Sequence, residues 1–166
     1  MIAAGHHPFA GIETEAGGVE LGETTAQKDR LVGHLRQEKY ANLIDQYGWG
    51  MITGQGDAQF FDETTLKVGS RTIRAQHAIV ATGARPSVPS IPGLEDVGYL
   101  TSTTALELDE LPRSLVVIGA GYIALELGQL FRRLGAEVTI LQRGPRLLPE
   151  AEPEVSEAVE TLLARE

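Results

Sequence analysis

The sequence predicts an α/β protein that combines a parallel sheet with a small antiparallel β-meander. The apolar run 115–118 and the segment 137–141 have the length of strands and flank a stretch with helical periodicity. A strand, a helix and a second strand in that order are typical of a βαβ unit, whose strands are parallel. Several short β-prone runs between residues 51 and 74 are separated by Gly, Asp and Glu, as in an antiparallel meander.

Length and composition narrow the class of protein. The 166 residues include 42% apolar residues, enough for a domain with its own core. No apolar run approaches the ~20 residues needed to cross a bilayer, and the first residues lack the basic and apolar segments of a signal peptide. We therefore expect a soluble, cytoplasmic protein with no membrane partner.

Charge and cysteine content exclude further classes. The net charge of −9 repels phosphate backbones, and no basic cluster offsets it, so we expect no nucleic-acid partner. The chain contains no cysteine, which excludes disulfides, thiolate metal sites and a dithiol redox centre within it.

The first half of the chain is predicted to hold one long helix. Residues 1–23 are rich in Gly and Ala and are expected to form a frayed helix end and a loop. From Thr24 to Tyr47 there is no proline, and apolar residues recur at helical spacings among charged ones. Gly48 follows at the position expected of a C-cap.

Short strands follow this helix. The expected meander strands are Met51–Thr53, Ala58–Phe60, Leu66–Val68 and Thr72–Arg74, with a tight turn at Gly69-Ser70. The apolar run Ala78–Ala81 predicts a strand buried on both faces that ends at Thr82-Gly83. The proline-rich segment 85–92 predicts an extended connector between two lobes.

The last third of the chain is predicted to form the βαβ unit. Leu115–Ile118 reads as a second buried strand, residues 119–134 as a helix, and Glu137–Leu141 as the next strand. Pro153, with glutamates on either side, predicts the N1 position of a last helix.

The segment from Gly119 to Ala124 is a glycine motif in the context that such a motif requires, since it follows an apolar strand and opens a helix. Gly119 permits the tight turn, Gly121 lets a pyrophosphate approach the backbone, and Ala124 keeps the helix close to the sheet. The amides of the first helical turn then face the anion. A glycine-rich turn without a ligand is the alternative.

The residues after the second βαβ strand indicate which nicotinamide cofactor is bound. An NAD-binding unit usually places a carboxylate there, roughly 20 residues after the glycines. In this chain Gln142 and Arg143 occupy that place, and Arg146 follows shortly after. A guanidinium pairs with the 2′-phosphate of NADPH, so the sequence favours NADPH over NADH, with Arg143 as the better candidate. Solvated surface charge is the alternative for both arginines.

These motifs resemble the flavin-dependent pyridine nucleotide–disulfide oxidoreductases. The segment from Gly119 to Glu126 resembles their nicotinamide-binding segment, and 81–86 with 91–93 resembles their crossing from the FAD domain to the NAD(P) domain. Within the family, five further segments are similar to the mercury-reducing members: 8–11, 38–40, 56–60, 100–106 and 141–143.

The resemblance implies a fold, cofactors and residue roles. It implies partial FAD/NAD(P)-binding Rossmann-like domains, with residues 1–111 from the first FAD-domain segment and 112–166 from the first βαβ of the NAD(P) domain. Ala58, Thr82 and Gly83 would contact FAD; Tyr122 would cover the nicotinamide pocket, and Glu126 would lie near the nicotinamide–flavin contact. Without the family resemblance, each residue has a simpler explanation. Tyr122 would pack along its helix, Glu126 would be a first-turn carboxylate stabilised by the helix dipole, and Thr82 would cap a strand.

The chain also departs from the family pattern. A member carries another glycine-bearing strand–helix unit for FAD, a redox cysteine pair and a C-terminal dimerisation domain, and none of these is present. The resemblance therefore implies an internal fragment of an enzyme in which NADPH reduces FAD, FAD reduces the cysteine pair, and the pair reduces Hg(II). We expect this chain alone to be inactive and marginally stable, with apolar edges uncovered.

Two other functions stay open at this point. The first is a fragment of a sister reductase that acts on lipoamide, glutathione or a related disulfide. The second is a non-catalytic nucleotide-binding module, which predicts tight NADPH binding by the lone chain, whereas a fragment predicts weak binding or none. A metal site at His6-His7 is disfavoured because adjacent residues seldom converge on one ion and no further ligand cluster is evident.

Overall fold

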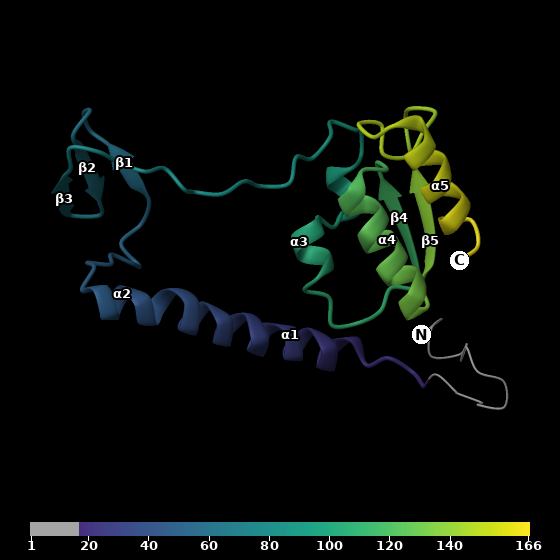
Figure 1. The fold of residues 1–166 in the computed structure, drawn as a ribbon, viewed down its shortest axis with the longest axis horizontal. Coiled ribbons are helices and arrows are strands. Elements are labelled where there is room, and N and C mark those ends of the chain that lie inside the picture. The colour runs from purple at the N-terminus through teal and green to yellow at the C-terminus, as the bar shows by residue number, and fades with distance from the viewer. Residues whose placement is uncertain (1–16) are drawn as a thin grey trace. The chain divides into compact units, whose positions relative to one another are not determined.

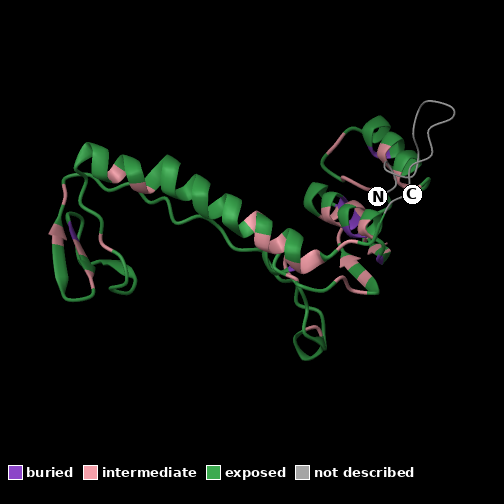
Figure 2. Ribbon diagram, turned by 90° about the horizontal axis from the view of Figure 1, so that it is seen from below, coloured by how far each residue is buried: buried purple, intermediate pink, exposed green. Residues whose placement is uncertain are grey.

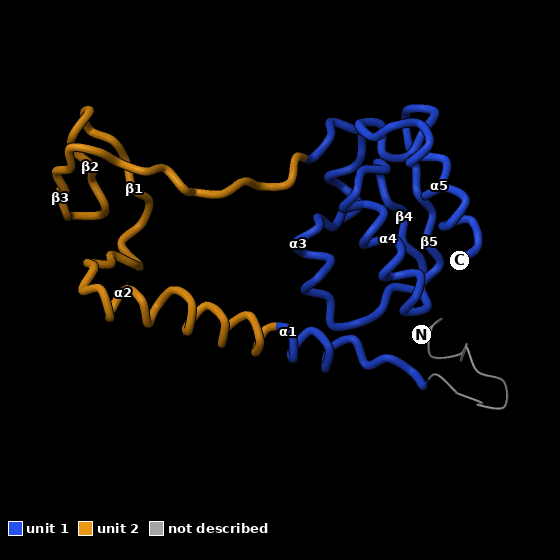
Figure 3. The backbone as a smooth tube through the Cα atoms, in the orientation of Figure 1, with its two compact units in different colours: residues 1–28, 88–166 blue, residues 29–87 orange. Residues whose placement is uncertain are grey.

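The computed structural model describes residues 17–166 (Figure 1). The described residues divide into two compact units, 17–28 with 88–166 and 29–87 (Figure 3). We describe each unit by itself. The predicted division at residues 111 and 112 follows the resemblance rather than compactness and stays a prediction.

The helix predicted from Thr24 to Tyr47 is confirmed and begins three residues earlier. It comprises α1 (Leu21–Arg36), a π-helical turn η1 (Gln37–Ala41) and α2 (Asn42–Tyr47). Gly48 ends it in the left-handed conformation (φ 64°) and donates its N–H to the carbonyls of Ile44 and Asp45.

The β-meander is confirmed for three of its four predicted strands. Strands β1 (Ala58–Phe60), β2 (Thr65–Val68) and β3 (Arg71–Arg74) form an antiparallel sheet in the order β1-β2-β3. Its first turn is fixed by Asp62, whose carboxylate accepts hydrogen bonds from the backbone N–H and the hydroxyl of Thr64. The backbone bond from Thr64 is the main cause of the lowered pKa of Asp62.

Two predicted strands in the second unit are wrong. Met51–Thr53 forms no strand, and Met51 is exposed. Ala78–Ala81 is also irregular, with Ile79 95% exposed, although a buried strand was expected. A strand needs a neighbour to bond its backbone and a layer to cover it, and the described residues supply neither to these two runs.

The predicted βαβ unit is confirmed in the first unit. Strands β4 (Ser114–Ile118) and β5 (Glu137–Leu141) pair in parallel, with Ile118 opposite Leu141. Helix α4 (Tyr122–Leu134) connects them, and α5 (Pro153–Leu163) begins at the predicted proline. A 3-10 turn, η2 (Glu95–Val97), and a short helix, α3 (Ser102–Ala105), precede β4.

The core of this unit lies between α4 and one face of the two strands. Phe131 and Ala136 are buried there together with Ala105, and Leu115 and Val138 of the strands pack against them. The expectation that Leu115–Ile118 is buried on both faces is wrong. Its alternate residues Val116 and Ile118 are 60% and 50% exposed, because only one face of this pair is covered within the described residues (Figure 2).

The end of the chain contacts α4. Arg133 donates two hydrogen bonds to the Glu166 carboxylate, from Nε at 3.0 Å and from Nη2 at 2.5 Å, and Gln129 Nε2 donates a third at 3.1 Å. The bonds from Arg133 are the main cause of the lowered pKa of Glu166. They hold the residues after α5 beside α4.

Candidate functional site

The glycine turn lies between β4 and α4. Gly119 follows the last residue of β4 with φ 101°, a conformation that side chains rarely adopt, and its N–H donates to the Leu141 carbonyl at 2.8 Å. Ala120 is 1% exposed. A Cβ built on Gly119 or Gly121 meets no atom within 4 Å, so no side chain fills the space over the turn.

Helix α4 begins at this turn without a side-chain cap. Gly121 is its N-cap residue, in an extended conformation (φ −77°, ψ 173°), and the Gly121 carbonyl accepts the bond from Leu125 N–H. The amides of the first turn have no acceptor within the helix, and the helix dipole adds partial positive charge there. The arrangement fits the diphosphate of a dinucleotide, which needs open backbone and N–H donors.

The helix packs closely on the sheet at Gly128, which was not predicted from the sequence. A Cβ on Gly128 would lie 3.4 Å from Ile140 Cδ1 and 3.6 Å from Val138 Cγ1. Ala124, predicted to hold the helix close, is half-buried one turn earlier. The spacing could have predicted this contact, because Gly128 lies four residues after Ala124 and therefore on the same face of the helix.

The three residues predicted to select the cofactor lie in the loop that follows β5. Gln142 is half-buried and its Nε2 donates to the Arg146 carbonyl at 3.4 Å. Arg143 is exposed and Arg146 is half-buried. Since β4 and β5 are parallel neighbours, their carboxyl ends meet at one edge, and this loop begins beside the glycine turn.

Two further predicted residues lie on α4 itself. Tyr122 is the first helical residue and is 68% exposed, so helix packing does not explain it. Glu126 is exposed and lies beyond the first turn of α4, which contains no acidic residue. The alternative interpretation of Glu126 as a first-turn carboxylate is therefore wrong.

The predicted FAD-binding residues lie in the second unit. Ala58 is the first residue of β1, is exposed, and pairs with Val68 of β2. Thr82 and Gly83 are exposed and belong to no strand, with Gly83 at φ 72°. Without a strand at 78–81, the strand-cap explanation of Thr82 has no basis, and the FAD roles of all three residues stay predictions.

A loop contact with the glycine turn was not foreseen. Leu148, in the loop between β5 and α5, has φ 45° and donates its N–H to the Ala120 carbonyl at 2.8 Å. Ser156 of α5 is 2% exposed, and its hydroxyl donates to the Leu147 carbonyl at 2.7 Å. Neither residue belongs to a motif, so no spacing in the sequence pointed to them.

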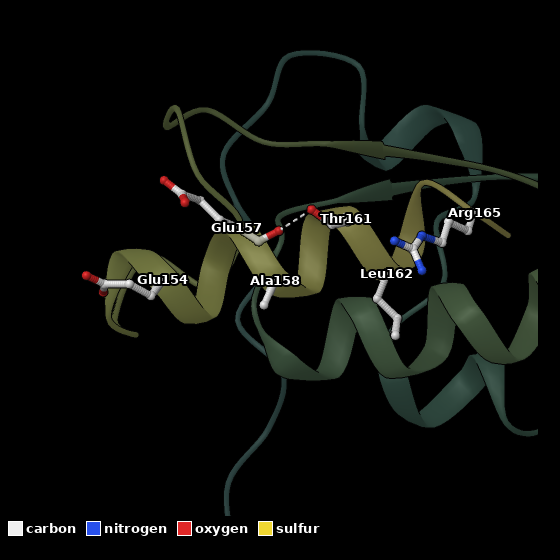
Figure 4. A pocket seen from close by; sticks show the side chains of 6 residues that line it. All are labelled: Glu154, Glu157, Ala158, Thr161, Leu162 and Arg165. Atoms are coloured by element: carbon white, nitrogen blue, oxygen red, sulfur yellow. Dashed lines mark hydrogen bonds between the residues drawn. The ribbon is translucent and has the colours of Figure 1, made fainter.

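A shallow hollow along α5 (Figure 4) contains none of the predicted site residues and is lined by Glu154, Glu157, Ala158, Thr161, Leu162 and Arg165. Residues 17–166 contain no group of three or more His, Asp or Glu side chains that would hold a metal ion. His6-His7 and the segment 8–11 lie outside the described residues. Within those residues, no helix has both the length and the apolar character needed to span a bilayer.

Known proteins resemble this chain over nearly its whole length. The chain is 49% identical to a mercuric reductase of Staphylococcus aureus over 163 residues, which are 98% of this chain and 29% of that protein. It is 51% identical to a mercuric reductase of Lysinibacillus sphaericus over 95% of this chain and 28% of that protein. The chain thus spans less than a third of the length of these relatives.

Solved structures resemble it as well. The Cu(II) complex of the HOCl-induced flavoprotein disulfide reductase RclA from Escherichia coli matches with a TM-score of 0.79 and 31% identity, covering 89% of this chain and 34% of that one. The family model of the pyridine nucleotide-disulphide oxidoreductases matches residues 2–166. The open glycine turn and the sequence agree on this point: the chain belongs to the pyridine nucleotide-disulphide oxidoreductase family.

Proposed function

We propose that the chain forms the NADPH-binding βαβ unit, and part of the FAD domain, of a flavoenzyme that reduces mercury(II). The observation that carries the proposal is the open glycine turn at the edge of a parallel strand pair, with an arginine loop beside it. The mercuric reductases that are about half identical to this chain support the choice of substrate.

The glycine turn and the loop after β5 bind different phosphates of the cofactor. The amides at the start of α4 bind the diphosphate, and the missing side chains of Gly119 and Gly121 leave room for it. Arg143, supported by Arg146, pairs with the 2′-phosphate, and Gln142 places no negative charge beside it. When bound, NADPH supplies a hydride for FAD.

The remaining predicted residues position the two cofactors. Exposed Tyr122 covers the nicotinamide pocket until the cofactor displaces it, and Glu126 lies near the nicotinamide–flavin contact. Ala58, Thr82 and Gly83 contact FAD. The parent enzyme is a homodimer.

Cofactor binding is tested by NMR titration of the 166-residue chain with NADPH and NADH. We expect weak binding, with shifts at the amides of Gly119 to Ala124 and a preference for NADPH. Arg143→Ala should lower NADPH affinity about tenfold and leave NADH affinity unchanged, since one charge-assisted hydrogen bond is lost. Arg113→Ala, an exposed arginine preceding β4, is the control and should change neither. Shifts elsewhere, or tight binding typical of a stand-alone module, would contradict the proposal.

The chain alone is expected not to reduce mercury. Thiolates suit the soft Hg(II) ion, and this chain contains no cysteine to hold it. NADPH-dependent release of Hg(0) from the purified chain would contradict this expectation.

A disulfide reductase is the second candidate, favoured by the structural similarity to RclA. The two candidates are separated by grafting the chain in place of the matching segment of the S. aureus mercuric reductase or of RclA. A mercury-reducing origin predicts that the first graft retains NADPH-dependent Hg(0) release and that the second loses its disulfide reductase activity. The reverse pattern would favour the disulfide reductase.

A further inference from the structure

Ser156 is a buried hydroxyl that the proposed cofactor chemistry does not use. It lies in the first turn of α5 with 2% of its surface exposed. Its Oγ donates to the Leu147 carbonyl at 2.7 Å and lies 3.5 Å from the Leu148 carbonyl. A buried hydroxyl needs such a partner, so this bond attaches the loop after β5 to α5.

The next residue of that loop has a backbone conformation that must be held in place. Leu148 has φ 45°, and among the described residues it is the one with a positive φ that is not glycine. Such residues persist where surrounding contacts fix them, often at functional sites. Here Ser156 bonds the chain at Leu147, and the Leu148 N–H bonds the Ala120 carbonyl at 2.8 Å.

Ala120 is the middle residue of the glycine turn, so these contacts continue into the proposed phosphate site. The turn is held from one side by the bond between Gly119 N–H and the Leu141 carbonyl, and from the other by Leu148. The same loop carries Arg143 and Arg146. Hydrogen bonds at Leu147 and Leu148 therefore link Ser156 to the glycine turn, and Arg146 is the residue directly before Leu147 in the same loop.

We propose that Ser156 is a positioning residue that holds the loop 142–152 against the glycine turn and thereby sets the selectivity for the 2′-phosphate. The proposal rests on the proposed NADPH binding. We expect that removing the Ser156 hydroxyl weakens binding of NADPH more than binding of NADH, because Arg143 and Arg146 move with the loop.

The experiment uses the 166-residue chain and three variants. Ser156→Ala removes the hydroxyl, and Ser156→Thr keeps it. Thr161→Ala is the matched control, since the Thr161 hydroxyl donates to the Glu157 carbonyl within the same helix (Figure 4). NADPH and NADH are the probes.

The first measurement is amide hydrogen exchange of Leu148 without cofactor. Ser156→Ala should speed this exchange about tenfold, while Ser156→Thr and Thr161→Ala leave it within twofold of the parent chain. Unchanged exchange in Ser156→Ala would overturn the proposal even if NADPH binds. Should Ser156→Ala fail to fold, Ser156→Cys, which keeps the volume and weakens the donor, takes its place.

The second measurement is the ratio of NADPH to NADH affinity by NMR titration. Ser156→Ala should lower this ratio by about fivefold to tenfold, and Thr161→Ala should not change it. An equal loss for both cofactors would overturn the role in selectivity. Failure of the parent chain to bind either cofactor would refute NADPH binding by the lone chain and with it the role in selectivity, and the exchange measurement would still decide whether Ser156 holds the loop.

Discussion

Two short apolar runs have different structures in this molecule. Val116 and its neighbours form β4. Ala78–Ala81 forms no strand, and its Ile79 side chain is 95% exposed. Both runs were predicted to be buried strands. β4 has a parallel partner, β5, and a covering helix, α4, that follow it directly in the chain. The run at 78–81 has neither among the described residues.

This difference shows that an apolar run specifies a strand only together with its neighbours. β-propensity largely measures packing against neighbouring strands and burial, so it cannot act on a run that has no partner. The two faces of β4 show the same dependence of burial on neighbouring elements within a single strand. Leu115 and Val117 are half-buried under α4, while Val116 and Ile118 on the other face remain exposed.

The sharpest test of the confirmed region separates folding from binding at Gly121. Its extended backbone is open to any residue, and an added Cβ meets nothing within 4 Å. Gly121→Val should lower the unfolding midpoint only slightly, as valine is a poorer N-cap residue than glycine. It should reduce NADPH affinity at least tenfold, because the side chain fills the diphosphate space. NMR titration and urea unfolding measure the two effects.

Gly50→Ala is the control for that substitution, since Gly50 also has open space and no positive φ. It should affect neither quantity. A Gly121→Val chain that binds NADPH normally would show that the cofactor does not approach this turn.

The helix–sheet contact gives the next largest effect. Gly128→Val places methyl groups where Ile140 and Val138 already lie, so it should lower the free energy of unfolding by about 1–3 kcal/mol. Gly33→Ala, an exposed helical glycine with open space around it, should instead raise it by about 0.5–1 kcal/mol. Urea unfolding followed by circular dichroism measures both. If both substitutions changed the free energy of unfolding by the same amount and in the same direction, α4 would not pack closely on β5.

The parts of the site that could be predicted from the sequence are those encoded by neighbouring residues. The order of β4, glycine turn, α4 and β5, and the place of Arg143 after β5, follow from spacing within about 30 residues. The contact between Leu148 and Ala120 lies within the same span but was not predicted, because it joins two backbone groups and a left-handed leucine has no sequence signature. The strand predicted at 78–81 was wrong for a different physical reason, because a strand needs a pairing partner that the run itself does not specify.

A pair of isoleucines tests the comparison between the two runs directly. Ile140→Ala removes apolar contacts under α4 and should cost about 1–2 kcal/mol of unfolding free energy, less than for a fully buried residue. Ile79→Ala should change it by less than about 0.5 kcal/mol, because the side chain is almost fully exposed. A large loss in Ile79→Ala would mean that the run at 78–81 is packed in solution.

The smallest effect concerns the contact of Glu166 with α4, and its sign depends on pH. The Arg133 bonds lower the pKa of Glu166 below its ordinary value of 4.5, so the folded chain favours the carboxylate more than the unfolded chain does. The contact therefore stabilises the fold fully above the unfolded pKa, and this contribution is lost as the pH falls through the folded pKa.

Glu166→Gln should lower the urea midpoint slightly at neutral pH. At pH values well below the folded pKa of Glu166, its urea midpoint should equal that of the parent chain. Glu160→Gln on exposed α5 surface is the control. A difference of equal size at both pH values would show that the ionised pair does not contribute, and that the amide disturbs packing at Gln129 and Arg133 instead.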